Sequence, residues 1–264
     1  SIGVFDSGIG GLTVLKEIIE QIPGEDIVYF GDTARIPYGT RSKETVIKYF
    51  FQSVRFLMSK DIKLIVVACN TASALAMEEA QKVFDIPIIG VIEPGSRAAA
   101  AMTKNSTIGV IGTEGTINSG TYQRKIRKML PSAEIIGIAC PLFVPIVEEG
   151  WENSDVAYIT AQKYLLELKE HNIDSLVLGC THYPALRYTL NKVFENKITL
   201  VNPAYETAKA TKILLKEQNL LSDKLEGGKA NFFVSDDPEK FKRIGGNILR
   251  KEIASVQKVN IENL

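Results

Sequence analysis

The sequence is poor in the features that define several large classes of protein. Its 264 residues contain only three cysteines and two histidines, and 31 Lys and Arg side chains balance 31 Asp and Glu side chains. Without a basic excess, we expect neither nucleic acid nor a membrane as a partner. Three cysteines are too few for a disulfide scaffold, so we expect reduced thiols and a cytoplasmic protein.

Long apolar runs are also missing. The longest, residues 64–69, has the length of a buried strand and falls far short of the roughly 18 residues of a membrane span. The chain opens on a strand pattern at Ile2–Phe5, from which we expect no signal peptide. Apolar residues nevertheless make up 45% of the chain and recur along it, which is typical of a folded protein rather than a disordered one.

Short Val- and Ile-rich runs alternate with longer amphipathic stretches. The predicted strands of the first part are Ile2–Phe5, Asp26–Phe30, Leu64–Ala68 and Ile88–Val91. The predicted helices between and after them are Leu12–Gln21, Ser42–Lys60, Ala72–Val83 and Ser96–Thr103. Continuously apolar strands separated by helices are typical of a parallel sheet covered on both faces. The predicted fold class is therefore α/β.

An internal repeat indicates that this unit occurs twice. The segments that match in the same order are Ile2–Gly8 with Ile108–Glu114, Asp26–Val28 with Glu134–Ile136, Ile36-Pro37 with Val144-Pro145, Ile62–Cys69 with Ile173–Cys180, and Val91–Pro94 with Leu200–Pro203. A period of this length is too long for a solenoid. It predicts two similar parallel-sheet α/β domains related by internal duplication, although shared α/β patterning alone remains an alternative.

The repeat also predicts domain boundaries. We expect a first domain of residues 1–97, completed by residues 208–264, and a second domain of residues 98–207. The C-terminal segment has the pattern of a helix at Thr207–Gln218, a strand at Ala230–Val234, a helix at Pro238–Leu249 and a last strand. We expect it to pack back on the first domain.

Two cysteines occupy equivalent places in the repeat. Cys69 and Cys180 each end an apolar strand and precede a helix, predicted to start near Thr71, as its N-cap, and near Pro184. Ligands of parallel sheets bind beyond the carboxyl ends of strands, and a helix N-terminus stabilises a thiolate. We therefore expect the two thiols on opposite walls of a cleft between the domains. We expect Cys140 to be a buried apolar residue.

Such a thiol pair is most consistent with acid–base chemistry. A redox couple usually has a Cys-X-X-Cys spacing, which is absent. Zinc needs three or four ligands, and of the two imidazoles we expect His171 at the surface; we therefore predict no metal. Two thiols that face one carbon can remove a proton from one side and deliver one from the other, which inverts a stereocentre. A cleft protein that binds a small dicarboxylate without chemistry remains an alternative.

Each thiol needs a neighbour that holds or relays a proton. His182 lies two residues after Cys180 and is the predicted helper there. Asp6 ends the first strand, where it is expected to bind an ammonium group or assist Cys69; the alternative is a helix N-cap. Either Glu148 or Glu149 is expected to orient His182, unless both are solvated loop charges.

The glycine-rich segment after Asp6 differs from nucleotide-binding motifs. Thr13 stands at the third glycine of the dinucleotide fingerprint, and a Walker motif is absent. We interpret the segment as an anion- or zwitterion-binding turn. Small hydroxyl and amide residues at other strand ends suit a small carboxylated substrate; they are Asn70, Thr71, Thr113 and Thr181. Because Arg35 and Arg41 are expected at the surface, we predict that backbone and hydroxyl donors bind the distal carboxylate.

Four motifs together resemble the aspartate/glutamate racemase family, and within it the glutamate racemases. They are Phe5–Gly11, Gly31–Gly39, Ala68–Ser73 and Leu178–Pro184. The resemblance extends from residue 1 to about residue 210, and the chain beyond supports no site residue. Aspartate racemases typically have Glu at the position of His182, which favours glutamate; aspartate or another amino acid remains an alternative.

The resemblance implies an activity and a set of site residues. The implied reaction is a cofactor-independent 1,1-proton transfer between L- and D-glutamate, with Cys69 acting on the D-isomer and Cys180 on the L-isomer. Asp6, His182 and Glu148 are the implied assistants. The implied substrate contacts are Asp6, Ser7, Tyr38, Gly39, Asn70, Thr71, Thr181 and His182. Family biology implies a homodimer that supplies D-glutamate for peptidoglycan, and thus for cell-wall biogenesis and cell shape.

Overall fold

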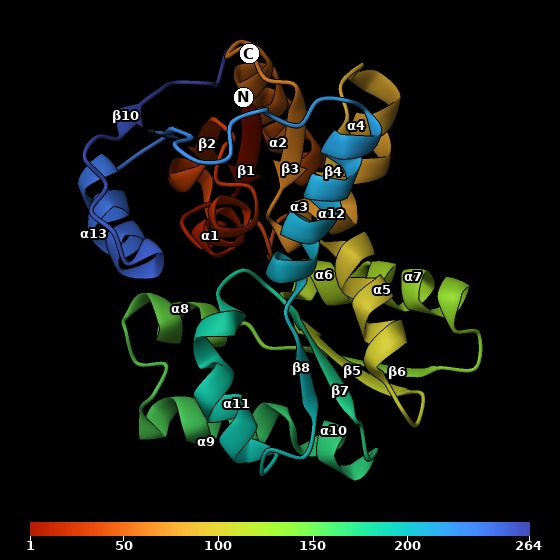
Figure 1. The fold of residues 1–264 in the computed structure, drawn as a ribbon. Coiled ribbons are helices and arrows are strands. Elements are labelled where there is room, and N and C mark those ends of the chain that lie inside the picture. Colours follow the sequence, from red (N-terminus) through yellow and green to blue (C-terminus); the bar gives the residue numbers. More distant parts are fainter.

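Two parallel sheets, one in each of two lobes, organise the chain (Figure 1). The computed structural model describes all of residues 1–264. The first sheet has the order β10 (Gln257–Lys258), β9 (Ala230–Val234), β2 (Ile27–Gly31), β1 (Ile2–Asp6), β3 (Leu64–Val67) and β4 (Ile88–Gly90). The second has the order β6 (Glu134–Ala139), β5 (Thr107–Gly112), β7 (Ser175–Gly179) and β8 (Thr199–Val201). All neighbouring strands are parallel, and the predicted fold class is confirmed.

Helices connect these strands and cover both sheets. In the first part of the chain they are α1 (Leu12–Gln21), the 3₁₀ helix η1 (Thr33–Arg35), α2 (Lys43–Met58), α3 (Asn70–Leu75), α4 (Met77–Val83) and α5 (Ile92–Met102). The second lobe adds α6 (Glu114–Asn118), α7 (Thr121–Met129), α8 (Phe143–Glu148), α9 (Asp155–Tyr164), α10 (Leu166–Glu170), the 3₁₀ helix η2 (Tyr183–Leu186) and α11 (Arg187–Val193). The last two are α12 (Pro203–Glu217) and α13 (Pro238–Leu249). None of the helices combines the length and apolarity that a membrane span requires.

The second sheet repeats the strand order of the first, as the internal duplication predicts. The order β2-β1-β3-β4 recurs as β6-β5-β7-β8. The register is conserved as well: Gly3 pairs with Val28 and Ile65, and Gly109 pairs with Ile136 and Leu176. These pairings reproduce the sequence offsets, since 109 − 3 = 106, 136 − 28 = 108 and 176 − 65 = 111.

The last sequence match is out of register by three residues. Ile65 pairs with Ile88, and its equivalent Leu176 pairs with Leu200, an offset of 200 − 88 = 112. The predicted match of Val91 with Leu200 has an offset of 109. These two edge strands have only three residues each, so their apolar pattern is too short to fix the alignment.

A close contact that only glycine permits is conserved in both sheets. A Cβ atom on Gly3 would lie 2.9 Å from Cδ1 of Ile62, and one on Gly109 would lie 2.8 Å from Cδ1 of Ile173. Ile62 and Ile173 are partners in the repeat. Each isoleucine thus packs directly on the central strand of its sheet, and the duplicated units share a core contact as well as a topology.

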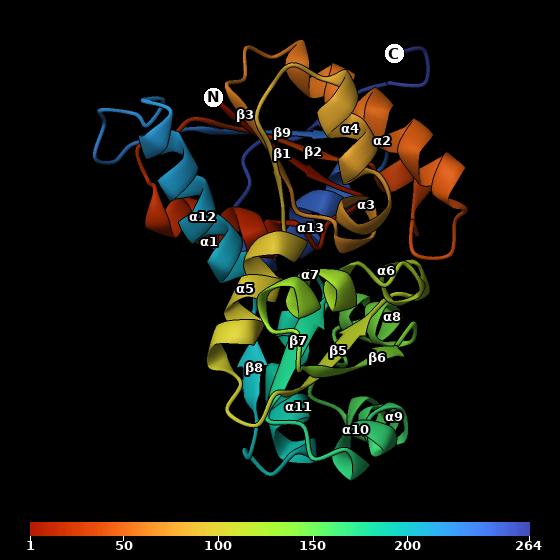
Figure 2. The ribbon, with the colours of Figure 1, turned by 90° about the vertical axis from the view of Figure 1, so that its right-hand side faces the viewer.

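One hydrophobic cluster runs through both lobes. It joins Ile2 and Val4 of the first sheet to Ile108 and Val110 of the second. The helices α5 and α12 cross between the lobes beside it (Figures 1 and 2). Burial of a continuous apolar surface holds the lobes against each other.

The C-terminal segment adds β9 and β10 to the edge of the first sheet, where β9 pairs with β2. The predicted boundaries 97/98 and 207/208 fall inside α5 and α12, and the division into domains remains a prediction. These helices start earlier than predicted, at Ile92 and Pro203, since proline is well placed in a first helical turn.

The predicted helix at Ala72–Val83 is two helices. Ala76, with φ −122° and ψ −12°, ends α3 and begins α4. A run of alanines and other good helix formers gives no signal for this interruption. The break turns α3 into a short helix that starts directly at the end of β3.

We predict that Asp32→Ala lowers the free energy of unfolding by about 3 kcal/mol, because it breaks a buried ion pair. The Asp32 side chain is fully buried and accepts hydrogen bonds from Arg35 Nε at 2.7 Å, Ser235 Oγ at 2.8 Å and the Tyr38 hydroxyl. Urea denaturation measures the effect. Glu79→Ala, which breaks exposed ion pairs, is the control and should change stability by less than about 1 kcal/mol. Equal losses in both variants would contradict the prediction.

Candidate active site

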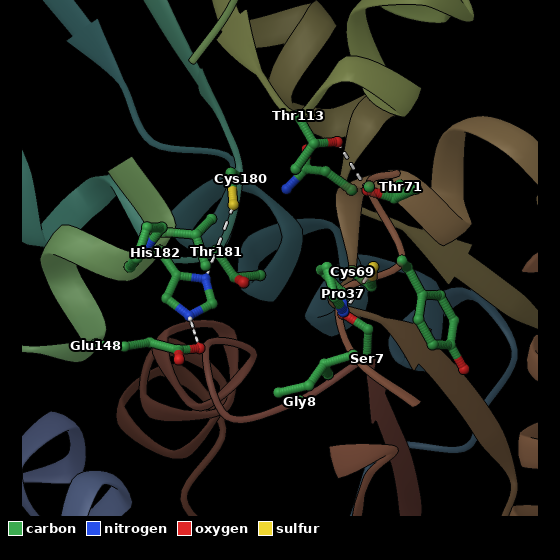
Figure 3. A pocket seen from close by; sticks show the side chains of 16 residues that line it. Ser7, Gly8, Pro37, Cys69, Thr71, Thr113, Glu148, Cys180, Thr181 and His182 are labelled. Carbon is green, nitrogen blue, oxygen red and sulfur yellow. Dashed lines mark hydrogen bonds and ion pairs between the residues drawn. The ribbon is translucent and has the colours of Figure 1, made fainter. Parts of the chain in front are cut away.

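A cavity lies between the carboxyl ends of the two sheets (Figure 3). It has an empty volume of about 760 Å³, which includes open solvent. Of the predicted site residues, all except Asp6 line it: Ser7, Tyr38, Gly39, Cys69, Asn70, Thr71, Thr113, Glu148, Cys180, Thr181 and His182. The topology therefore brings side chains from distant parts of the sequence, and from both lobes, to one small space.

Cys69 caps the helix that follows it. The backbone N–H of Ala72 donates to Cys69 Sγ at 3.4 Å, which makes Cys69, and not Thr71 as predicted, the N-cap of α3. The thiol in turn donates to Ser7 Oγ at 3.4 Å. Burial, together with the nearby charge of Asp6, raises the pKa of Cys69 to about 12. These surroundings therefore favour the protonated thiol of Cys69.

Cys180 belongs to a different set of contacts (Figure 3). Its Sγ lies 3.8 Å from His182 Nδ1, and His182 Nε2 lies 3.2 Å from Glu148 Oε1. Burial alone lowers the pKa of His182, but the hydrogen bonds with Cys180 and Glu148 raise it to about 10. The hydrogen bond with His182 also lowers the pKa of Glu148. Of the two predicted carboxylates, Glu148 contacts His182, whereas Glu149 is exposed.

Asp6 does not reach the cavity. It is only 1% exposed, its Oδ2 accepts from the backbone N–H of Gly8 at 2.9 Å, and its Oδ1 has no partner. Burial raises its pKa. The N-cap position of α1 is Gly11, without a side-chain cap, so Asp6 is not that N-cap. Asp6 therefore lies one layer behind the glycine-rich turn, and its expected contact with an ammonium group stays a prediction.

Three threonine hydroxyls join the lobes at the cavity. Thr71 Oγ1 lies 2.9 Å from Thr113 Oγ1, which in turn lies 3.0 Å from Thr116 Oγ1. Thr113 also caps α6, since it accepts from the backbone N–H of Thr116. Thr116 was not predicted as a site residue, although it lies three residues after Thr113, at the spacing typical of an N-cap contact.

No lysine or arginine lines the cavity. Arg35 instead pairs with Asp32 and lies 4.1 Å over the ring of Tyr49, whereas Arg41 is exposed. Donors for a carboxylate are therefore hydroxyl, amide and backbone N–H groups, with His182 the one side chain that can carry positive charge.

Two apolar pairs in the cavity wall were not predicted as site residues. They are Ile36-Pro37 from the first lobe and Val144-Pro145 from the second. The internal repeat aligns these pairs with each other, so the signal that would have found them was present. Equivalent apolar residues thus form parts of the wall on both sides.

The remaining cysteine and histidine lie elsewhere. Cys140 is fully buried, with its Sγ 3.7 Å from the carbonyl oxygen of Ile138, and it does not line the cavity. His171 Nδ1 lies 2.9 Å from Glu134 Oε1 at the surface. No group of three or more His, Cys, Asp and Glu side chains is arranged to hold a metal ion.

Comparison with known proteins identifies the class as the racemases, which are isomerases. A family model described as Asp/Glu/Hydantoin racemase matches residues 2–211, and the chain belongs to this family. The resemblance seen in the sequence motifs and the predicted enzyme class are thereby confirmed.

The individual relatives are similar over nearly their whole length. The chain is 51% identical to a glutamate racemase of Geobacter metallireducens, over 99% of this chain and 97% of the relative. A crystal structure of glutamate racemase from Bacillus anthracis matches with a TM-score of 0.95 at 41% identity, covering 99% and 97% of the chains. The structure of the Francisella tularensis enzyme in complex with D-glutamate matches with a TM-score of 0.93 at 39% identity, covering 100% and 98%.

We predict that the contacts of His182 make stability fall as pH rises. The folded-state pKa of about 10 exceeds the unfolded value of about 6.5. The stabilisation is therefore complete below about pH 6.5 and is lost by about pH 10. Because one pKa unit corresponds to about 1.4 kcal/mol, the loss is on the order of a few kcal/mol.

Urea denaturation at pH 6.5 and pH 10 measures this change. His182→Gln should reduce the decrease in the free energy of unfolding between these two pH values. His171→Gln is the matched control, because that side chain is 42% exposed, and should behave like the unaltered protein. The prediction is wrong when the decrease has the same size in all three proteins.

Proposed function

We propose that this protein is a glutamate racemase that exchanges protons between two cysteines and the α-carbon. The observation that carries the proposal is the pair Cys69 and Cys180, which line one cavity from equivalent strand ends of the two lobes. The similarity to glutamate racemases over nearly the whole chain supports glutamate as the substrate.

In the proposed reaction, one thiol acts as the base and the other as the acid. With L-glutamate, the Cys180 thiolate removes the α-proton, and the Cys69 thiol delivers a proton to the opposite face of the same carbon. The products are D-glutamate, a Cys180 thiol and a Cys69 thiolate, so that protons and charge balance. D-glutamate reacts by the reverse of these steps. The raised pKa of Cys69 favours its thiol form, which is the acid in the direction from L- to D-glutamate.

The neighbouring charged groups act on the two thiols in different ways. Glu148 accepts from His182 and holds the ring with Nδ1 toward Cys180, where an imidazolium stabilises the thiolate. Asp6 acts through its charge, which favours the protonated form of Cys69. Both residues are therefore proposed to assist the thiols.

The carbanion-like transition state needs donors aimed at the substrate in a space that excludes bulk water. We propose that Ser7, the Tyr38-Gly39 backbone, Asn70, Thr71, Thr113, Thr181 and His182 supply these donors. The apolar pairs Ile36-Pro37 and Val144-Pro145 limit the access of water. No cofactor takes part in the proposed reaction.

The family resemblance also supports a proposal for the cellular role. We propose that the enzyme supplies D-glutamate in the cytoplasm for peptidoglycan synthesis, and thereby serves cell-wall biogenesis and cell shape. We also propose that it acts as a homodimer.

Deuterium exchange tests the two-thiol reaction. In deuterated water, D-glutamate formed early from L-glutamate should carry deuterium, because the Cys69 proton has exchanged with solvent, whereas recovered L-glutamate should stay protiated. Chiral separation and mass spectrometry measure both. Equally fast labelling of recovered substrate would indicate a single exchanging base. If aspartate rather than glutamate acquires deuterium, aspartate is the substrate. If glutamate binds but acquires no deuterium, the protein is a binding protein without racemase activity.

We further predict that Cys69→Ser and Cys180→Ser each lower kcat/KM by at least about 10²–10⁴-fold in both directions, since each direction needs one acid and one base. Cys140→Ser is the matched control, because this buried cysteine does not line the cavity; it should keep kcat/KM within about threefold of the unaltered enzyme, less than one lost hydrogen bond would cost. Near-normal racemisation by Cys69→Ser or Cys180→Ser would exclude the proposed reaction.

Binding of the carboxylates without a lysine or arginine gives another prediction. Thr71→Val removes a hydroxyl from the cavity and should raise KM about 10-fold, the effect of one hydrogen bond to a charged group. Arg35→Ala and Arg41→Ala should leave KM nearly unchanged, because neither side chain lines the cavity. Steady-state kinetics measures these effects. A larger increase for either arginine variant than for Thr71→Val would show that a cation binds the carboxylate.

A further inference from the structure

Tyr122 contacts the segments beside both thiols. This tyrosine lies in the first turn of α7 and is only 1% exposed. Its hydroxyl donates across the lobes to Asn70 Oδ1 at 2.7 Å, and Asn70 is the residue after Cys69. Its ring packs against Gly179, the residue before Cys180, where an added Cβ would lie 3.2 Å from the Tyr122 Cε2 atom. One buried side chain thus connects the two strand ends that carry the thiols.

The hydrogen bond determines which way the Asn70 amide faces. Asn70 lines the cavity and is 5% exposed. The amide oxygen and nitrogen point in different directions, so engaging Oδ1 with Tyr122 leaves Nδ2 directed elsewhere. Tyr122 takes the oxygen, which leaves the NH₂ group on the other branch of the amide. An amide N–H donor is therefore left for a ligand in the cavity.

The Tyr122 hydroxyl keeps its proton and can donate a hydrogen bond. Burial, with a further contribution from the charge of Cys180, raises the pKa of Tyr122, so the hydroxyl keeps its proton over the working pH range. A hydroxyl can also accept a hydrogen bond. In the structure the 2.7 Å contact pairs the phenolic proton with Oδ1, which favours the orientation with the NH₂ group away from Tyr122.

We infer that Tyr122 is a positioning residue for the reaction: it holds the Asn70 amide with its NH₂ group toward a carboxylate of the substrate. Without the phenol, the amide is free to turn its oxygen toward the carboxylate, which is repulsive. This inference rests on the proposed function, since it assumes a carboxylated substrate in the cavity.

Tyr122→Phe tests the inference, because it keeps the ring on Gly179 and removes only the hydroxyl. We expect KM to rise about 10-fold for both isomers, as for the loss of one hydrogen bond to a charged group, and kcat to change less. Tyr164→Phe is the matched control: its hydroxyl accepts from the backbone N–H of Leu142, outside the cavity. It should leave KM unchanged.

A double-mutant cycle separates positioning from a general effect on structure. In an Asn70→Ala background, Tyr122→Phe should have no further effect on KM, because its only route to the substrate is gone. Additive effects, or an unchanged KM in Tyr122→Phe alone, would overturn the inference. If the unaltered enzyme does not racemise glutamate, the proposed function fails; calorimetric binding of D-glutamate to the same variants then tests the positioning role by itself.

Asn70→Asp provides a test that keeps Tyr122 intact. An aspartate accepts from Tyr122 as the amide oxygen does, but presents an oxygen to the cavity in place of NH₂. It should weaken binding of D-glutamate more than Asn70→Ala does. Binding of D-glutamate by Asn70→Asp that is equal to or tighter than binding by Asn70→Ala would overturn the inference. Because this test does not use Tyr122→Phe, it applies even where that variant does not fold.

Discussion

The close approach of two sheet ends is the constraint on which the site depends. The Gly39 carbonyl oxygen accepts from the Gly115 backbone N–H at 2.9 Å across the lobes. A Cβ atom on Gly10 would lie 2.3 Å from Thr181 Oγ1. The loops of the two lobes therefore lie so close together that a side chain in place of Gly10 or Gly39 would push the two strand ends apart. Because one hydrophobic cluster spans both lobes, packing sets the width of the cavity.

Within this duplicated frame, the surroundings of the two thiols have diverged. Cys69 lies at a helix N-terminus with a hydroxyl partner and a buried carboxylate nearby, whereas Cys180 faces the His182–Glu148 pair. In the proposed reaction this asymmetry is permitted, because L- and D-glutamate have equal free energies in water. Equal energies require equal kcat/KM values in the two directions, but they do not require equal pKa values for the two bases.

The sequence predicted the fold and most of the cavity because both follow from local patterns that the duplication repeats. The apolar strands and their order determined which residues lie at the carboxyl ends of the strands, and hence the positions of Cys69 and Cys180. Features set by tertiary contacts were less predictable. Cys69 is its own helix cap, Asp6 lies behind the turn rather than in the cavity, and Tyr122 reaches Asn70 from the other lobe. No local pattern encodes a contact between residues 52 positions apart.

A cavity in which His182 is the one side chain that can carry positive charge is suited to a reaction that needs one thiol and one thiolate at once. A fixed arginine beside both sulfurs would favour ionisation of each and would tend to remove the proton that the acid must deliver. Hydroxyl and amide donors bind a carboxylate without that effect, but an amide presents either a donor or an acceptor, depending on its orientation. In the proposed reaction, recognition of a carboxylate by Asn70 therefore needs a second group that orients the amide, and the buried Tyr122 hydroxyl lies 2.7 Å from its Oδ1. Recognition of a carboxylate by uncharged amide donors thus depends on residues that do not themselves line the cavity.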